Sequence, residues 1–399
     1  MMLTDPTSLS GFAFSTGERT APPSMMLTDP TSLSGFAFST DVSGLRYWDL
    51  HIFLLLPTLW LLTVGKPQML LSGGGSSSSG DGSAVAPADA YGELKQTAAY
   101  SFIAFILAIS VAQAFIWDSV GAEIGIWMFN PLKCTGVEGV DTLLPVEEVA
   151  WLFHHVMKAA LWQLKVAELP WTEPDSDEPS PLPTYLRDLG NVMLGAVAIG
   201  GVTALLGDAD SAKCVGLVAA FFAPVFLIVY NLGRRYFRSH WKLFLIGWLP
   251  PGLWTVAIDA LGQQQEVWYF PPRYLTGIND PFGGWLKLDI AAVYMVSTLA
   301  VTATGAIIFA AAEEFSRRKS ALTAEVEPGD GAAAVVAKPN LWDLGLFIFD
   351  GAFPGAAKWP QRTYLDSYAG AARAEREAAE AAEEERRKKA AEAQRREIV

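Results

Sequence analysis

Residues 143–162, LLPVEEVAWLFHHVMKAALW, place ionisable side chains on an otherwise apolar helix. Pro145 suits the first position of a helix, where its missing N–H costs nothing. Glu147 and Glu148 then lie in the first turn, where the positive end of the helix dipole favours negative charge. At about 100° per residue, two neighbouring stripes result: Glu147, Trp151, His154 and Lys158 on one, and Glu148, Leu152 and His155 on the other.

An ionisable stripe on an apolar helix must face the interior of a helix bundle or a wet cavity. Two interpretations are equally open at this point. In the structural one, the carboxylates cap the helix and the other polar side chains tie helices together. In the functional one, the stripe supplies the acid or base of a buried site.

The composition of the chain is that of a membrane protein. Of its 399 residues, 51% are hydrophobic and only 18% are charged, and the mean hydropathy is positive at +0.26. Seven apolar segments have the length of about 20 residues that crosses a bilayer, namely 47–65, 97–117, 145–164, 189–207, 213–232, 241–261 and 287–311. The sequence therefore predicts an all-α integral membrane protein with a bundle of seven transmembrane helices.

Charge and motif content exclude several classes of protein. A net charge of −13 argues against a nucleic-acid partner. Cys134 and Cys214 have no metal-ligand spacing and are too few for a disulfide framework, so we expect buried free thiols and no metal site. No GxGxxG motif follows a strand pattern, so neither a flavin nor a nicotinamide fold is predicted. We expect no cofactor.

The N-terminal end reads as a leader. Residues 1–16 recur unchanged at 25–40, and this short duplication, rich in Ser and Thr, predicts a disordered segment over 1–46. A plastid transit peptide, and hence a plastid membrane, is an alternative for it. Four acidic residues in the segment, Asp5, Glu18, Asp29 and Asp41, argue against that alternative.

Basic residues set the predicted orientation of the bundle. Two clusters flank segments five to seven, namely Arg234, Arg235, Arg238 and Lys242, and Arg317, Arg318 and Lys319. With seven crossings both clusters fall on one side, which the positive-inside rule assigns to the cytoplasm or its organellar equivalent. The tail at 312–399, with a charged helix at 371–396, is then on that side, and Glu147 and Glu148 are on the other.

An internal repeat is visible in two loops. Residues 117–137 read WDSVGAEIGIWMFNPLKCTGV, and residues 258–278 read IDALGQQQEVWYFPPRYLTGI. At a constant offset of 141 residues the identical pairs are Asp118/Asp259, Gly121/Gly262, Trp127/Trp268, Phe129/Phe270, Pro131/Pro272, Thr135/Thr276 and Gly136/Gly277. After Gly277 the second copy has one additional residue, and with this gap Asp289 aligns with Glu147.

Each predicted unit consists of three helices, with this loop between the second and the third. The first unit covers 47–164 and the second 213–311, and an acidic loop with a linking helix at 165–212 joins them. An even number of crossings between the units makes the repeats parallel, related by a pseudo-two-fold axis along the membrane normal. Glu147 and Asp289 then lie at one face around a shared axis, where a bundle places a cavity.

The W-D…G…W-x-F…TG loop, followed by L-P-V-E-E at 144–148, resembles the heterodimeric and fungal-type lycopene β-cyclase domain over about residues 47–311. The resemblance implies a fused two-unit enzyme that converts lycopene to cyclic carotenes without the flavin fold of plant-type cyclases. Fungal fusions also carry a phytoene synthase, whose Asp-rich helices are missing after residue 311. The second unit departs from the family pattern, since 286–290 read LKLDI. Either the first unit alone supplies the acid, or the activity is lost or changed.

Cyclising an end of lycopene requires an acid that protonates an isolated alkene. The neighbouring double bond attacks the resulting cation, and loss of a ring proton gives the β-ring without any redox step. Paired carboxylates suit this task because desolvation and mutual repulsion hold one proton on the pair. Glu147 or Glu148 is the candidate acid and Asp289 its counterpart in the second unit. A charged Lys158 would hold Glu147 ionised, which favours Glu148.

Aromatic faces stabilise a migrating cation by roughly 0.5–2 kcal/mol. The candidate substrate-binding residues are Trp127, Phe129, Trp151, His154, Trp268 and Phe270. An interfacial aromatic belt is the alternative for those in the loops. Structural roles as caps and turns are assigned to the remaining motif residues, namely Asp118, Pro145, Thr135, Gly136, Asp259, Thr276 and Gly277.

Three functions stay open on the sequence. The leading hypothesis is a lycopene cyclase that forms γ- or β-carotene. The second is a catalytically degenerate carotenoid-binding or assembly protein, which the altered second unit suggests. The third is a transporter, suggested by parallel repeats and intramembrane acids. The expected partners are lycopene or a related carotenoid and the lipid bilayer, and contacts with other carotenoid enzymes are left open.

Overall fold

The computed structural model describes residues 43–71, 87–135, 144–172, 182–278, 286–326, 341–352, 381 and 384–389. Both copies of the duplicated segment, nearly all of the predicted leader at 1–46, and Gly136 lie outside the described residues. The seven described helices of 16 residues or more are α1 (Tyr47–Leu62), α2 (Pro87–Gln113), α4 (Val146–Val166), α5 (Thr184–Leu206), α6 (Lys213–Gly233), α7 (Trp241–Gln264) and α8 (Leu288–Val326). Each overlaps one of the seven apolar segments that the sequence predicts.

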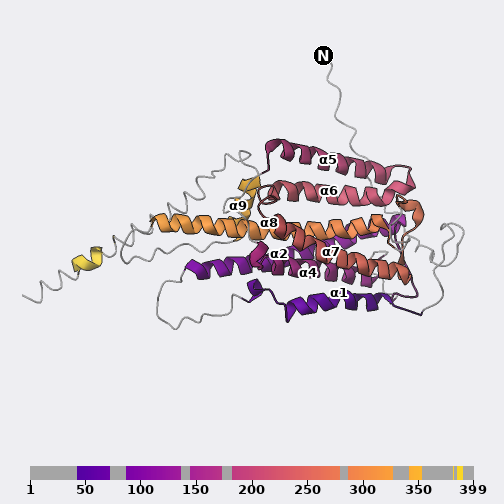
Figure 1. Ribbon diagram of the computed structural model, residues 1–399, viewed down its shortest axis with the longest axis horizontal. Helices are drawn as coiled ribbons and strands as arrows, with labels where there is room; N and C mark the ends of the chain where they lie inside the picture. The colour runs from indigo at the N-terminus through magenta and orange to yellow at the C-terminus, as the bar shows by residue number, and fades with distance from the viewer. Residues whose placement is uncertain are drawn as a thin grey trace, which may run out of the picture. The chain divides into compact units, whose positions relative to one another are not determined.

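The long helices run side by side as one bundle (Figure 1). α4 and α8 pack against each other at its centre, α1 covers α4, and α6 covers α8. α5 packs on α6 at the margin and exposes apolar side chains along most of its length, with Gly201 as its one buried residue. The centre of the bundle is therefore formed by the third and the seventh predicted segment.

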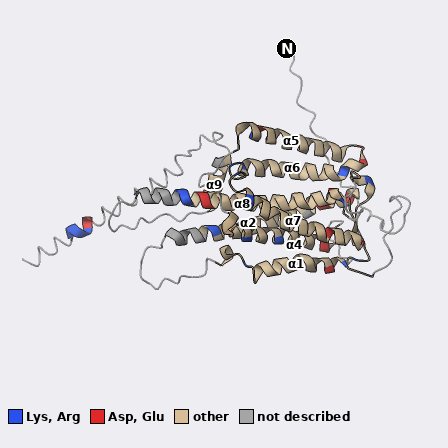
Figure 2. Ribbon diagram, viewed as in Figure 1, with Lys and Arg blue, Asp and Glu red and all other residues tan. Residues whose placement is uncertain are grey.

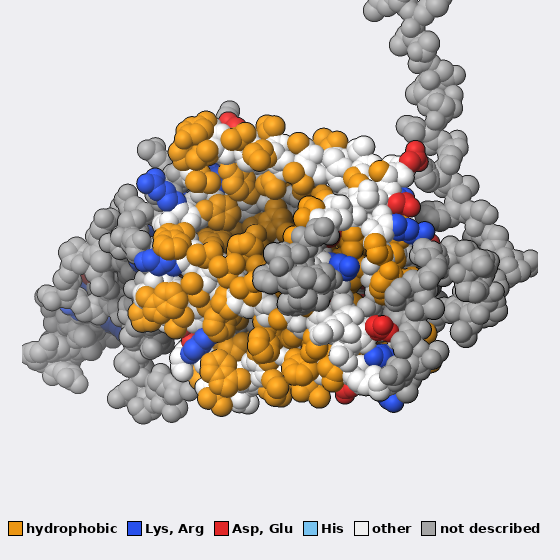
Figure 3. All heavy atoms as spheres, turned by 45° about the vertical axis from the view of Figure 1, so that its right-hand side comes forward, with side chains coloured by type: hydrophobic (Ala, Val, Ile, Leu, Met, Phe, Trp, Pro, Cys, Tyr) orange, Lys and Arg blue, Asp and Glu red, His pale blue; other side chains and the backbone are white. Residues whose placement is uncertain are grey.

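Five described helices are long and apolar enough to cross a bilayer, namely Leu94–Ile124, Thr184–Leu206, Asp210–Gly233, Trp241–Gln264 and Leu288–Arg318. α1 is apolar but shorter, and α4 carries two glutamates and two lysines. Charged side chains lie mainly near the helix ends (Figure 2). Hydrophobic side chains cover most of the middle of the face in Figure 3. The described residues are thus mostly helical and fit an all-α membrane protein.

Tryptophan side chains compensate for two of the prolines inside helices. A proline in a helix leaves the carbonyl four residues earlier without its N–H donor. Pro57 frees the carbonyl of Phe53, which accepts a hydrogen bond from Trp254 Nε1 at 3.0 Å. Pro250 likewise frees the carbonyl of Ile246, which accepts one from Trp162 Nε1 at 2.8 Å. In a bilayer these donors replace the water that is missing there.

Two short strands join the loops that the sequence aligns. β1 (Met128–Phe129) and β2 (Trp268–Tyr269) are antiparallel, with Met128 opposite Tyr269 and Phe129 opposite Trp268. The turn before each strand contains a residue with positive φ, Gly125 at 81° and Glu266 at 51°. These two residues are also 141 positions apart, so the two turns occupy equivalent positions and share a backbone conformation. Glycine adopts this conformation easily, but only the first turn has a glycine there.

Both predicted basic clusters meet at one end of the bundle. Arg235, just after α6, binds the carboxylate of Glu314 on α8. Glu314 also pairs with Arg318 at 2.7 Å and accepts a hydrogen bond from the Tyr236 hydroxyl at 3.0 Å. α8 extends beyond the predicted end at 311 because such pairs, one turn apart, stabilise a helix that has left the apolar region.

The C-terminal segments are described in part. The short helix α9 (Leu341–Ala352) packs Leu344 and Phe347 against the cluster around Phe315 of α8. Within the predicted charged helix at 371–396, the described residues 384–389 are helical and exposed, with lysine–glutamate pairs one turn apart at 2.7 Å.

Candidate active site

A narrow cavity of about 40 Å³ lies between the loop strands and helices α2, α4 and α8. Two carboxylate side chains line it, Glu148 and Asp118, together with the imidazole of His155. Most of the remaining wall is aromatic, formed by Trp117, Trp127, Phe129, Trp268, Phe270 and Tyr294. Glu148, Leu152 and His155 reach it together because steps of four and three residues return to the same side of a helix.

Glu148 is buried, with 9% of its surface exposed, and its partner comes from another helix. The hydroxyl of Tyr47, the first residue of α1, donates a hydrogen bond to Glu148 Oε2. Tyr47 is completely buried and packs on Trp268 and Phe129. The carboxyl group is therefore held in one orientation at the cavity wall. No spacing or motif in the sequence singled out Tyr47.

Glu147 and Asp289 do not line this cavity, and both bind the backbone of a threonine. Glu147 Oε1 accepts a hydrogen bond from the N–H of Thr135 at 2.6 Å. Asp289 Oδ2 accepts the equivalent bond from the N–H of Thr276 at 3.0 Å, and its carboxylate also accepts from the Thr276 hydroxyl. Each carboxylate at the start of its helix thus fastens the loop that precedes it. Pro145 is the N-cap of α4, one residue before the predicted first position.

Asp118 and Asp259 differ in their surroundings, although the sequence aligns them. Asp118 ends a π-helical turn, Ala114–Asp118, and lines the cavity. Among the described residues its Oδ2 has no hydrogen-bond partner, although the side chain is only 4% exposed. Asp259 lies in the regular helix α7 and accepts hydrogen bonds from Trp268 Nε1 at 2.9 Å and Gln263 Nε2 at 2.5 Å.

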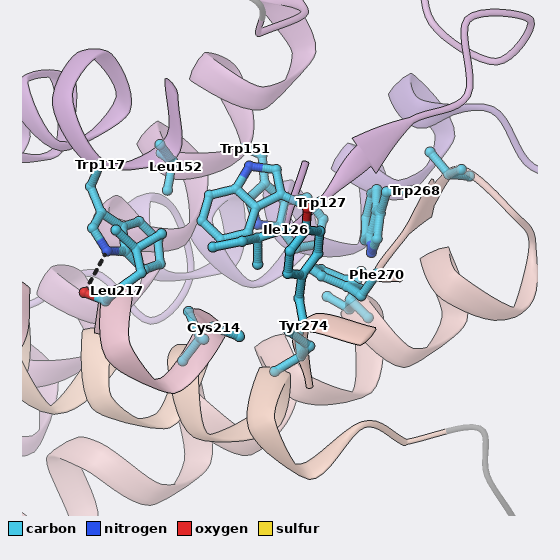
Figure 4. Packing of buried hydrophobic residues seen from close by; sticks show 14 of the residues in the cluster. Trp117, Ile126, Trp127, Trp151, Leu152, Cys214, Leu217, Trp268, Phe270 and Tyr274 are labelled. Carbon is cyan, nitrogen blue, oxygen red and sulfur yellow. Dashed lines mark hydrogen bonds between the residues drawn. The ribbon is translucent and has the colours of Figure 1, made fainter. Parts of the chain in front are cut away.

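Four tryptophan side chains gather in this part of the core (Figure 4). Trp151 packs edge-on against Trp268 with ring centroids 5.1 Å apart, and Trp117 lies 5.2 Å from Trp127. Of the six predicted substrate-binding residues, Trp127, Phe129, Trp268 and Phe270 line the cavity. Trp151 does not line the cavity but packs against Trp268. The signal that located these rings was their recurrence in both loops.

His154 lies away from the cavity. Its Nδ1 is 3.0 Å from Nδ1 of His51 on α1, and the side chain is half-buried. The histidine at the cavity wall is His155, which the sequence placed on the neighbouring stripe of the same helix. The pattern of apolar residues could not tell which stripe faces the axis, because both flanks of α4 are covered by other helices.

A buried polar network continues from the cavity along α4. His155 Nδ1 lies 3.0 Å from Thr255 Oγ1, and its Nε2 lies 3.2 Å from Ser297 Oγ. Lys158 Nζ donates to the same Thr255 hydroxyl at 2.5 Å and to the carbonyl of Pro251 at 3.1 Å. The lysine, 2% exposed, is therefore directed toward α7, and among the described residues it forms no ion pair with Glu147.

Reciprocal bonds tie the two loops together. The hydroxyl of Tyr274 donates to the carbonyl of Ile124 at 2.9 Å, and Lys133 Nζ donates to the carbonyl of Gln265 at 2.5 Å. Tyr274 is 141 residues after Lys133, and Gln265 is 141 residues after Ile124. A side chain of each loop therefore donates a hydrogen bond to a backbone carbonyl of the other loop, and the two bonds join equivalent positions. Reciprocal bonds of this kind are typical of two units related by a two-fold axis.

Both cysteines are free thiols, as the sequence predicts, with Cys214 buried and Cys134 half-buried. Burial, and then the negative charge of Glu147 and Glu148, raise the pKa of the Cys134 thiol to about 12. This thiol stays protonated at neutral pH. Within the described residues no group of three or more His, Cys, Asp or Glu side chains could hold a metal ion.

The fold and the site define a class: a helical membrane protein with buried carboxyl groups in an aromatic cavity. The chain is 26% identical over 208 residues to the lycopene beta-cyclase of Halobacterium salinarum, in each of two strains. The match covers 52% of this chain and 81% of each relative. This likeness supports a lycopene cyclase family. No family model matches the chain, and no solved structure matches it.

Proposed function

We propose that the chain is a membrane lycopene cyclase, which closes β-rings on the ends of lycopene by acid catalysis without an electron carrier. The likeness to the halobacterial lycopene beta-cyclases supports this reaction. The assignment of the active site depends on one observation. The buried carboxyl group of Glu148, bound by Tyr47, lies in a cavity lined by aromatic rings.

Glu148 is the proposed acid. A carboxyl group in an apolar, water-poor cavity keeps its proton more readily than one in water. It gives this proton to the terminal alkene of the substrate, and the neighbouring double bond closes the ring. The faces of Trp127, Trp268 and Phe270 line the space where the positive charge develops, and each can stabilise it by roughly 0.5–2 kcal/mol.

Glu147 and Asp289 have a supporting role in this proposal. Each accepts the backbone N–H of a loop threonine and so holds the aromatic loop residues against the cavity. A shorter aspartate fulfils this role in the second unit, where the paired acid is missing. One acid site, in the first unit, is then sufficient for the reaction at each end of a substrate in turn.

The cavity must widen when the substrate binds. Pockets for small molecules usually measure about 300–1,000 Å³, and about 40 Å³ accommodates only water-sized groups. Side chains of the wall, rather than helices, are the parts that can move at lowest cost. The narrow cavity keeps bulk water away from the acid until a hydrocarbon end displaces the aromatic rings.

The proposal includes seven membrane crossings and two parallel three-helix units, 47–164 and 213–311, around a pseudo-two-fold axis. Supporting observations are the reciprocal loop bonds, the matched Glu147 and Asp289 contacts, and the meeting of both basic clusters at one end. The positive-inside rule then puts the C-terminal tail on the cytoplasmic or equivalent side. A plastid membrane and contacts with other carotenoid enzymes stay proposals without further support.

Expression in a lycopene-accumulating bacterium tests the function. The wild-type chain is expected to form γ- or β-carotene, detected by pigment chromatography. Glu148→Gln is expected to abolish ring formation, because the amide carries no transferable acid proton. Glu147→Gln, one residue away, is the matched control and is expected to keep the activity per folded protein within about threefold of wild type.

A second function is favoured by one observation, the small volume of the cavity. A chain that kept the fold but lost catalysis would bind a carotenoid without cyclising it. Lycopene that co-purifies unchanged with the wild-type protein would establish this alternative and contradict the cyclase proposal. Proton uptake by liposomes that contain the protein would instead favour a transporter.

A further inference from the structure

We infer that Asp118 is a further catalytic residue, the base that removes the ring proton in the last step of the proposed cyclisation. This inference rests on the proposed function. It replaces Glu147 by Asp118 as the partner of Glu148, since Asp118 and Glu148 line one cavity and Glu147 does not.

The backbone geometry brings the carboxyl group of Asp118 to the wall of the cavity. The π-helical turn Ala114–Asp118 adds one residue to the helical turn and rotates the side chains that follow it. Trp117 and Asp118 both reach the cavity, where the Trp117 indole is fixed by a 3.3 Å bond to the carbonyl of Leu217. The Asp118 side chain is buried, and its Oδ2 has no protein partner among the described residues. A buried acceptor without a donor is costly unless a ligand or a reaction uses it.

The other buried acids either accept hydrogen bonds elsewhere or lie outside the cavity. Glu147, whose Oε2 also has no partner among the described residues, does not line the cavity. Asp259, the counterpart of Asp118, accepts bonds from Trp268 and Gln263 and does not line the cavity. Asp289 is bound to Thr276 through both of its oxygens. His155 lines the cavity, but both of its ring nitrogens lie against the hydroxyls of the network along α4. Among the described residues, Asp118 is therefore the carboxyl group that lines the cavity beside Glu148.

The proton balance of the cycle closes with these two carboxyl groups. In this proposal the two carboxyl groups share one proton, which is on Glu148 when the reaction begins and leaves Asp118 ionised. The Glu148 proton forms a new C–H bond at the terminal alkene, and the ring C–C bond forms by attack of the second alkene. The ring cation then loses a proton to Asp118, and that electron pair becomes the ring double bond. Transfer of the proton from Asp118 back to Glu148, across one narrow cavity, restores the starting state.

In this proposal the position of the base also selects which ring forms. The ring cation can lose a proton from either neighbouring ring carbon or from the methyl group, giving the β-ring, its ε isomer or an exocyclic methylene. A base fixed on one side of the ring selects one of the three. Loss of Asp118 should therefore change the mixture of products as well as their amount.

The test compares Asp118→Asn with Asp259→Asn in the lycopene-accumulating host. Asparagine keeps the side-chain carbonyl that can accept the Trp268 bond, so Asp259→Asn is a matched change of charge outside the cavity. Asp118→Asn is expected to slow ring formation by about 10²- to 10⁴-fold and to shift the residual product away from the β-ring. Asp259→Asn is expected to keep at least a third of the wild-type rate per folded protein and the wild-type product.

Asp118→Glu provides a readout that does not depend on the asparagine variant accumulating in the membrane. It keeps a carboxyl group but moves it by one methylene, so ring formation should persist with an altered isomer ratio. Wild-type rate and products in both Asp118 variants would overturn the inference and leave the cyclase function intact. A wild-type chain that forms no ring would overturn the proposed function and, with it, this inference.

Discussion

The hydroxyl of Tyr47 donates a hydrogen bond to Oε2 of Glu148, a residue 101 positions later in the chain. The bond joins the first turn of α1 to the first turn of α4 and orients the proposed acid. A hydrogen bond to a neutral carboxyl group contributes about 0.5–1.5 kcal/mol, and one to an ionised carboxylate about 1.5–3 kcal/mol. Its loss should therefore be visible in both stability and turnover.

Tyr47→Phe is expected to slow cyclisation by about tenfold to a hundredfold, as roughly 1.4 kcal/mol corresponds to a factor of ten. The initial rate of ring formation per folded protein measures this effect. Tyr100→Phe is the matched control, because the Tyr100 hydroxyl donates to the carbonyl of Leu70 at 3.2 Å, away from the cavity. An unchanged rate in Tyr47→Phe would contradict an orienting role.

Glu147→Gln and Asp289→Asn should act on stability rather than on chemistry. Each replaces a charged acceptor of a threonine N–H by a neutral one, which weakens that bond by about half. We expect a loss of about 1 kcal/mol in the free energy of unfolding for each variant, measured by denaturant unfolding in detergent. Complete loss of activity in Glu147→Gln at normal stability would return the acid role to that residue.

Gly121→Ala should displace an aromatic wall of the cavity. A Cβ atom at Gly121 would lie 2.0 Å from the indole of Trp127, and one at Gly262 would lie 2.2 Å from that of Trp268. Overpacking of this kind costs about 1–3 kcal/mol, and we expect at least a tenfold loss of ring formation, since the displaced ring lines the site.

The control for this prediction is Gly200→Ala on α5, where an added Cβ meets nothing within 4 Å. Alanine is the better helix former by about 1 kcal/mol, so this variant should be as stable as wild type or slightly more stable. A thermal unfolding series of the two variants and wild type distinguishes crowding from a general effect of replacing glycine.

The buried His240 should make the free energy of unfolding depend on pH. Burial, followed by the positive charge of Arg317, lowers the pKa of His240 to about 4. The unfolded chain, with a histidine pKa of about 6.5, binds this proton more readily than the folded one. The stabilising contribution is therefore complete above about pH 6.5 and is lost as the pH falls toward 4, amounting to about 3 kcal/mol at most.

Unfolding midpoints of wild type and His240→Gln, measured between pH 8 and pH 4, check this prediction. The difference in the free energy of unfolding between the two proteins should stay constant above about pH 7 and shrink below about pH 6. A difference that does not change with pH would show that His240 is not buried in its neutral form.

The helices follow from local sequence, and this is why they were predictable. Runs of apolar residues of bilayer length form helices whatever they pack against, because the backbone must satisfy its own hydrogen bonds there. α8 ends later than the apolar run predicts, because Glu314 and Arg318 continue the helix by pairing after that run stops. The recurrence of Trp127 and Phe129 as Trp268 and Phe270 is visible in the sequence and predicts four rings of the cavity wall.

The roles of the acids could not be predicted in the same way. Glu147 and Glu148 are neighbours on one helix turn and differ only in direction by about 100°, so their partners decide between a loop contact and the cavity. Asp118 and Asp259 are aligned and identical, yet a π-helical turn exposes only Asp118 to the cavity.

By itself the sequence determined the membrane-length helices, the matched loops and the set of acidic and aromatic side chains available for chemistry. Only the tertiary structure decided which acid meets Tyr47, which one fastens a threonine and which one shares the cavity with Glu148. The physical reason is that helix formation depends on neighbours along the chain, whereas the state of a buried carboxyl group depends on donors that arrive from distant helices.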